Sequence, residues 1–256
     1  MRLFRVTEKA PAKQKKKIIR DEKMRIIIET VISLVLICTG YVGTCVYLKN
    51  GTIKKFNKSD IAIDSKSKVI YIVFAVLKSI CIVALFNTIY VSHSIIHQLK
   101  LLVLIDSILP MAAVDYKKHK IPNPFLIVSL VLCMVLYIAE LVFSPSTVLD
   151  SLKDGVIGAA VIGLFFLLIS LIFKNSMGMG DIKLFALMGL YQGLWGAFNS
   201  VFFSLLVSFF LALGLLISKK KKRKDSISFG PSILLGTIIA IGLSGIKTTR
   251  PTGGLL

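Results

Sequence analysis

The sequence predicts an all-α, polytopic transmembrane bundle of about eight spans. Of its 256 residues, 55% are hydrophobic, and the mean hydropathy is +0.81. The apolar residues form long runs that lack the alternation of a membrane β-barrel. The net charge of +19 falls in short connectors beside these runs, which is typical of cytoplasmic loops that contact anionic lipid and not of a nucleic-acid-binding protein.

The N-terminal part divides into an arm and a first membrane region. Residues 1–25 contain ten Lys and Arg against three acidic residues and no apolar core. We expect a basic arm that is solvated or lies on the membrane surface, and not a cleavable signal. Residues 26–98 form an N-terminal transmembrane region with spans at 26–48 and 69–91. A basic connector at 49–68 joins the two spans.

Two charged residues interrupt the next apolar runs. Lys78 lies in the second span and Asp106 in the third, which is predicted at 95–114. If these spans form an antiparallel hairpin, a rise of 1.5 Å per residue puts both charges roughly 13 Å from the same membrane face. Because intramembrane charges are usually matched, we predict a structural ion pair between Lys78 and Asp106.

No metal or other cofactor is expected. His93 and His97 are one helical turn apart and could face one ion, but no carboxylate accompanies them as in zinc enzymes. We interpret both as interfacial polar residues. The four cysteines lie inside apolar runs without a Cys-x-x-Cys pair, which predicts small core residues.

Residues 99–246 form the predicted transmembrane core, which opens with the end of the third span. The basic loop 115–124 follows, and its two prolines end one helix and start the next. A fourth span is expected at 125–143 and a fifth at 155–173. The loop between them, 144–154, is richer in acidic than in basic residues, so we expect it outside the cell.

The C-terminal part of the core contains three more predicted spans. They lie at 182–198, 201–218 and 229–246, with a turn near Asn199 and a tail at 247–256. The first of them follows a glycine-containing loop, and the second is stopped by a basic cluster.

The distribution of positive charge orients the bundle. If the basic connectors are cytoplasmic, Asp115 and Asp181 both face the cytoplasm. Counting back through three spans then puts residues 1–25 outside, despite their positive charge. Either the first apolar run does not cross fully, or the arm opposes the usual charge bias.

Asp115 and Asp181 are the candidate site. Asp115 ends a helix that arrives at the cytoplasmic face, and Asp181 begins one that leaves it. Two carboxyl groups close together in a poorly solvated site tend to share one proton. One can take a proton from water while the other protonates a scissile carbonyl, which is the chemistry of an aspartic protease. The pair titrates as a unit, so the sequence does not assign the acid and the base.

Three segments together resemble the type IV prepilin peptidases, a family of membrane aspartic proteases with a Gly-x-Gly-Asp signature. They are Ala112–Asp115 followed by Ile121-Pro122-Asn123, then Gly178–Leu184, and finally Ser228–Pro231. The resemblance covers residues 101–245, which is somewhat over half of the chain.

This resemblance implies that Asp115 and Asp181 form a catalytic dyad. It implies cleavage at the cytoplasmic face of the plasma membrane, after the basic leader and before the hydrophobic helix of a prepilin or pseudopilin. Gly178 and Gly180 are then expected to admit the substrate backbone. Lys183 is expected to help orient Asp181.

One departure from the family pattern bears on the activity. Many bacterial members carry paired Cys-x-x-Cys zinc motifs beside a methyltransferase function, and this chain has none. We therefore expect a peptidase without methyl transfer. Two alternatives remain open, an ion or proton-coupled transporter that uses the intramembrane carboxylates, and an inactive relative that acts in pilus assembly.

Overall fold

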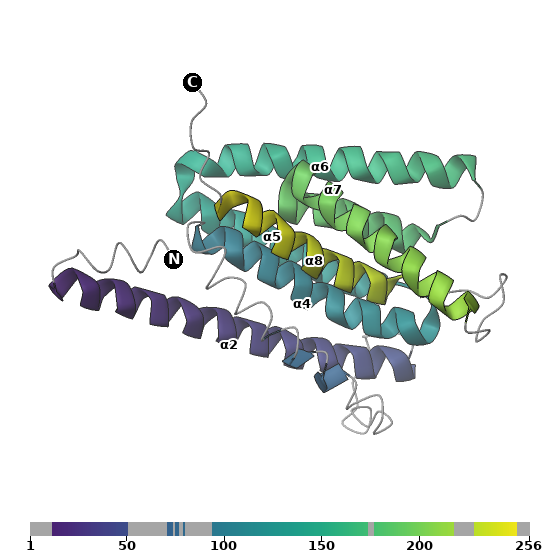
Figure 1. Ribbon diagram of the computed structural model, residues 1–256, viewed down its shortest axis with the longest axis horizontal. Coiled ribbons are helices and arrows are strands. Elements are labelled where there is room, and N and C mark those ends of the chain that lie inside the picture. Colours follow the sequence, from purple (N-terminus) through teal and green to yellow (C-terminus); the bar gives the residue numbers. More distant parts are fainter. Residues whose placement is uncertain are drawn as a thin grey trace.

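The fold was taken from a computed structural model. It describes residues 12–50, 71–73, 75–76, 79, 94–173, 177–217 and 228–249. None of these residues is in a β-strand, and the long helices pack side by side in one bundle (Figure 1). The expected all-α fold is confirmed. Lys78 and most of the predicted second span lie outside the described residues.

Within the described ranges, five helices are long and apolar enough to cross a membrane, which makes this a multi-pass membrane protein. They are α2 (Ala12–Asn50), α4 (Ile95–Lys118), α5 (Asn123–Phe143), α6 (Pro145–Ile172) and α7 (Met179–Ile217). A shorter apolar stretch, Gly230–Ser244, forms most of α8 (Gly230–Thr249).

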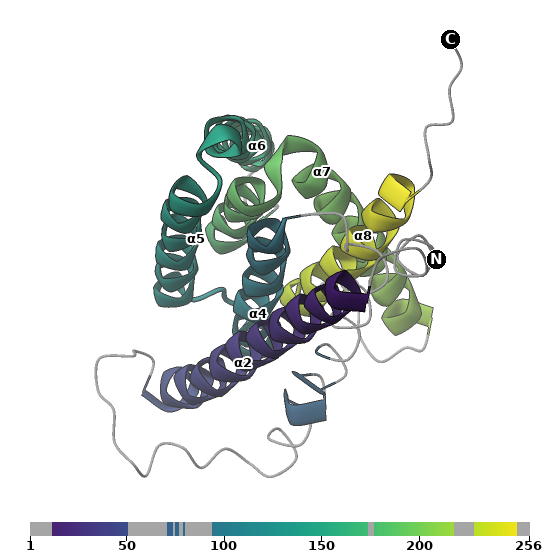
Figure 2. The ribbon, with the colours of Figure 1, turned by 90° about the vertical axis from the view of Figure 1, so that its left-hand side faces the viewer.

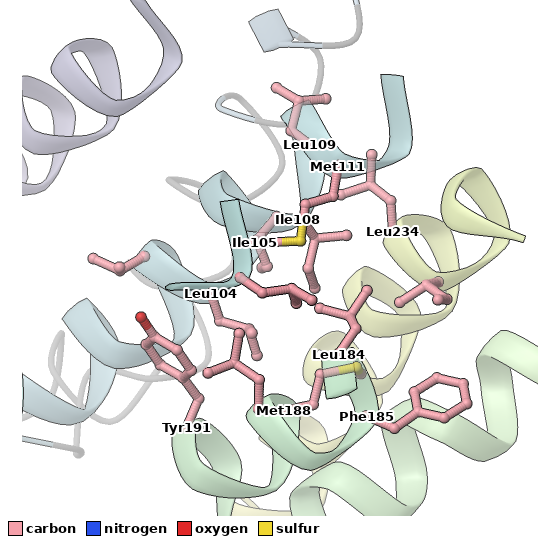
Figure 3. Packing of buried hydrophobic residues seen from close by; sticks show 14 of the residues in the cluster. Leu104, Ile105, Ile108, Leu109, Met111, Leu184, Phe185, Met188, Tyr191 and Leu234 are labelled. Carbon is pink, nitrogen blue, oxygen red and sulfur yellow. The ribbon is translucent and has the colours of Figure 1, made fainter. Parts of the chain in front are cut away.

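Helix α4 is the centre of the bundle and contacts α2, α5, α7 and α8. In its most apolar stretch 72% of the residues are buried, compared with 11–33% in the other candidate spans, whose remaining apolar side chains are left for lipid. Figure 3 shows its leucines and isoleucines packed against α7 and α8. The residues labelled there are Leu104, Ile105, Ile108, Leu109, Met111, Leu184, Phe185, Met188, Tyr191 and Leu234.

Helix α2 runs parallel to α4, because the contacts between them advance together along both helices. The Ser33 hydroxyl donates to Asp106 at 3.4 Å, and further along Lys118 Nζ donates to the Tyr47 carbonyl at 2.9 Å. The C-terminal ends of α2 and α4 therefore share one end of the bundle. Helix α2 begins at the other end of the bundle (Figures 1 and 2), and the side of the membrane on which the N-terminal arm lies stays a prediction.

The predicted loop 144–154 is wrong, because these residues are almost entirely helical. Ser144 alone separates α5 from α6, which begins at Pro145. Proline is favoured in the first turn of a helix, where its missing N–H leaves no bond unmade. The acidic side chains of this stretch therefore lie on the first turns of α6, where Asp154 contacts α7.

The predicted turn near Asn199 lies at Gly193 instead, where φ is 72°. Gly193 divides α7 into a first arm (179–192) and a second arm (194–217). Figure 1 shows α7 folding back at this point, so that both of its ends lie at the same end of the bundle. The Asp154 carboxylate accepts a hydrogen bond from the Leu194 N–H at 3.2 Å and so caps the second arm. A Cβ at position 193 would lie 2.6 Å from Asp154 Cγ, so only glycine fits this reversal.

Candidate active site

The two sequence-predicted carboxylates lie at the end of the bundle where α4 ends and α7 begins. Asp115 is in the last turn of α4 and only 5% exposed. His119 follows in the left-handed conformation and its N–H donates to the Asp115 carbonyl at 2.8 Å, which turns the chain away from the helix. Asp181 is in the first turn of α7, half-buried, and close enough to Asp115 for the two carboxyl groups to interact electrostatically.

The loops that precede and follow these helices pack against each other. A Cβ at Gly180 would lie 2.9 Å from Ile121 Cβ and 3.2 Å from the Ile121 carbonyl oxygen. Glycine at this position therefore lets the start of α7 reach the loop between α4 and α5. On the surface beside this contact, Lys183 Nζ donates to Asn123 Oδ1 at 3.2 Å.

Gly178 holds the carboxylate of Asp181 over the first turn of α7. Its carbonyl accepts the Asp181 N–H at 3.0 Å, and its backbone also hydrogen bonds to the Asp181 side chain. A Cβ at Gly178 would lie 3.0 Å from Asp181 Oδ2. Gly178 is exposed, so its backbone is accessible at the rim of the candidate site.

The third motif reaches the same site from α8. The N–H of Gly230 donates to Asp115 Oδ2 at 2.7 Å, in a buried hydrogen bond. The ring of Phe229 packs edge-on against Phe185, with ring centroids 5.8 Å apart. Phe185 lies one helical turn after Asp181, so the start of α8 contacts both helices that carry the carboxylates.

The remaining sequence-predicted site residues lie elsewhere or are not described. Asp106 is buried in α4 and accepts the hydrogen bond from Ser33. Its predicted partner Lys78 lies outside the described residues, as does His93, and His97 is in the first turn of α4. Among the residues that the structure describes, no group of three or more His, Cys, Asp or Glu is arranged to hold a metal ion.

The sequence analysis missed a buried ion pair between Lys100 of α4 and Glu140 of α5. Lys100 Nζ lies 2.6 Å from Glu140 Oε2, 3.1 Å from Ser151 Oγ and 3.5 Å above the centre of the Tyr137 ring. Lys100 is 15 residues before Asp115, or roughly 22 Å along α4, so this pair is far from the candidate site. A charge inside the apolar run 125–143 was the signal that could have identified Glu140.

Comparisons with known proteins agree with the motif assignment. Residues 102–217, which include Asp115 and Asp181, match the type IV leader peptidase family. The chain is 33% identical over 138 residues to a prepilin leader peptidase/N-methyltransferase of Bacillus subtilis (strain 168). That match covers 54% of this chain and 53% of the relative, so the chain spans about half the length of this curated protein. No solved structure matches the chain significantly. Residues 102–217 of this chain are therefore similar to the type IV leader peptidase family.

Proposed function

We propose that the chain is a prepilin leader peptidase of the aspartic type. It removes the basic leader from prepilin-like or pseudopilin precursors at the cytoplasmic face of the plasma membrane. The observation that carries this proposal is the meeting of Asp115 and Asp181 at one end of the bundle, from two helices that are far apart in the sequence. The family match of residues 102–217 supports the same activity.

The proposed mechanism uses the two carboxyl groups and one water molecule. Neighbouring carboxyl groups resist ionising together, so one proton is shared between them. The ionised member takes a proton from water, and the resulting hydroxide attacks the scissile carbonyl. The protonated member donates its proton to the carbonyl oxygen, which gives a neutral tetrahedral intermediate. When this intermediate collapses, the member that took the proton from water gives it to the leaving amine, and the other member takes a proton from a hydroxyl of the intermediate. The dyad then again holds one proton in its starting arrangement.

The glycines and Lys183 have distinct proposed roles around the dyad. The exposed backbone of Gly178 admits the extended substrate segment next to Asp181. Gly180 keeps the first turn of α7 against Ile121. Lys183 acts on Asp181 indirectly, since its hydrogen bond to Asn123 ties the first turns of α7 and α5 together. Anionic lipid around the basic connectors holds this end of the bundle at the membrane surface.

A cleavage assay with a pilin-like precursor in proteoliposomes tests the proposal. We expect Asp115→Asn and Asp181→Asn each to abolish processing while the protein remains folded. Asp106→Asn is the matched control, because Asp106 is an equally buried carboxyl residue of the same helix as Asp115. Cleavage by both dyad variants would overturn the proposal, and ion flux without cleavage by the wild type would favour a transporter.

We further propose that this chain does not transfer methyl groups. The curated relative is named as both a leader peptidase and an N-methyltransferase, but its match covers only part of each protein. The paired Cys-x-x-Cys motifs of bifunctional members do not occur in this sequence. Incubation with a methyl-labelled donor and a cleaved pilin checks this directly. A labelled pilin N-terminus would contradict it.

A further inference from the structure

The start of α8 contributes a backbone group to the candidate active site. Its first residue, Gly230, is buried, and its N–H donates to Oδ2 of Asp115, a residue 115 positions earlier in the chain. The first N–H groups of a helix have no partner within the helix. Asp115 therefore caps α8 from a different helix, as side-chain oxygens at N-cap positions do locally.

The local sequence makes this contact possible. A Cβ at Gly230 would lie 2.8 Å from the Ala112 Cα and 3.0 Å from the Asp115 Cβ, so any larger residue would push α8 away from α4. Pro231, the next residue, has no N–H and favours the start of a helix. The N–H of Gly230 is therefore directed at the carboxylate by a segment that is shaped to approach it.

A hydrogen bond to one carboxylate oxygen restricts what the other oxygen can do. An N–H that donates to a charged oxygen forms a short, strong bond, and here the N-terminal end of the helix adds its positive dipole. Resting on the proposed aspartic-protease function, we propose that the N-terminus of α8 is part of the catalytic apparatus. The Gly230 N–H fixes Oδ2 of Asp115, so that Oδ1 is the oxygen that exchanges a proton with water. Gly230 is thus a positioning residue that acts through Asp115.

Replacing the Gly230 amide by an ester tests this role directly. Glycolic acid is incorporated at position 230 during cell-free translation into nanodiscs. This replacement removes the backbone N–H and leaves every side chain unchanged. The N–H is not needed for a bond within α8. The ester also weakens the Phe229 carbonyl, which accepts the Ile233 N–H at 3.0 Å, so the control must carry the same change of a helix carbonyl. We expect kcat to fall about ten- to a hundredfold, as for the loss of a hydrogen bond to a charged group, with KM unchanged.

The matched control is the same replacement at Gly214, in the second arm of α7. A Cβ there would meet no atom within 4 Å, and its N–H is far from Asp115 in sequence. This ester removes a backbone N–H from a helix without touching the dyad, so we expect wild-type kcat per folded molecule. Wild-type kcat in the position-230 ester, or an equal loss in both esters, overturns the inference.

A second measurement detects the bond without altering it. Phe229–Gly230 is the only Phe-Gly pair in the sequence, so labelling Phe with ¹³C at the carbonyl and Gly with ¹⁵N selects a single amide resonance. We expect this amide proton to be shifted downfield in the wild type and to move upfield in Asp115→Ala, but not in Asp106→Ala. An unchanged resonance in Asp115→Ala overturns the inference.

The experiment separates this inference from the function on which it rests. If Asp115→Asn and Asp181→Asn both retain cleavage, the proposed function fails. If both variants are inactive while the position-230 ester cleaves at the wild-type rate, the function stands and only the role of α8 fails.

Discussion

Two buried carboxyl groups of this protein have opposite kinds of neighbour. Glu140 lies 2.6 Å from the Lys100 ammonium, which also contacts Ser151 and the face of the Tyr137 ring. Asp115 instead lies beside a second acid, Asp181, and accepts one backbone N–H. A carboxylate with a cation is electrically satisfied and inert, whereas two adjacent carboxyl groups hold a proton that can be exchanged.

The comparison shows that burial of charge alone does not identify a reactive site. The two sites lie toward opposite ends of α4, so one helix carries both a structural ion pair and the proposed dyad. The ion pair fixes α4 against α5 and α6 at one end. The proposed dyad is assembled at the other end, from the ends of three helices.

The largest effect is expected from the dyad. We predict that Asp115→Asn and Asp181→Asn each lower kcat by at least about 10³-fold, because the loss of either partner removes the proton exchange. The double variant should be no slower than either single variant, since the two residues act as one unit. Steady-state cleavage of a pilin-like precursor measures this. Additive losses in the double variant would mean that the two groups work independently.

Breaking the ion pair should affect stability and not chemistry. Lys100→Met leaves Glu140 buried without its cation, and we expect a loss of about 3–5 kcal/mol in the free energy of unfolding. In the double variant Lys100→Met/Glu140→Leu most of this loss should be recovered, because no uncompensated charge remains. Unfolding by SDS in mixed micelles measures both variants. A stable single variant would show that the pair does not hold α4 against α5.

A smaller effect is predicted at the reversal of α7. Asp154→Ala removes the acceptor for the Leu194 N–H, and we expect a loss of about 1 kcal/mol in the free energy of unfolding. Asp154→Asn is the control, since asparagine caps helices about as well as aspartate. The same SDS titration compares the two. Equal stability of both variants with the wild type would remove Asp154 as the cap.

The smallest effect is expected from Lys183, on the surface beside the dyad. Lys183→Met removes the hydrogen bond to Asn123, and we predict little change in stability because the pair is exposed. If this bond steadies the start of α7, cleavage should slow by less than the loss of either aspartate causes. Asn123→Ala should give the same rate as Lys183→Met. Different rates in the two variants would show that Lys183 acts by another route.

The sequence predicted the parts of the fold that depend on apolar length and on strong local signals. The spans that became α4 and α5 were predicted within a few residues, because Pro122 and Pro124 mark the boundary between them. The loop 144–154 was mispredicted, because charged residues in the first turns of a helix resemble a loop in composition.

The reversal in α7 was displaced for a different reason. A glycine inside an apolar run has many roles, and the need for one at position 193 arises from Asp154 on another helix. The ion pair of Lys100 with Glu140 and the hydrogen bond of Gly230 to Asp115 likewise depend on which helices are neighbours, which one sequence does not provide. The dyad residues themselves were named from the sequence because their motifs are local, although their joint action stays a prediction.

The reversal at Gly193 fixes one end of the first arm of α7, so a tilt of this arm would move its other end most. Its far end is fixed by Asp154 and by close backbone contacts with α6, while Asp181 lies 12 residues away, or roughly 18 Å. A tilt of about 10° around that pivot therefore displaces the Asp181 carboxyl group by about 3 Å, which is close to the diameter of a water molecule. The contacts of Gly180 with Ile121 and of Lys183 with Asn123, at the Asp181 end of this arm, therefore set how precisely the two carboxyl groups of the proposed dyad are placed.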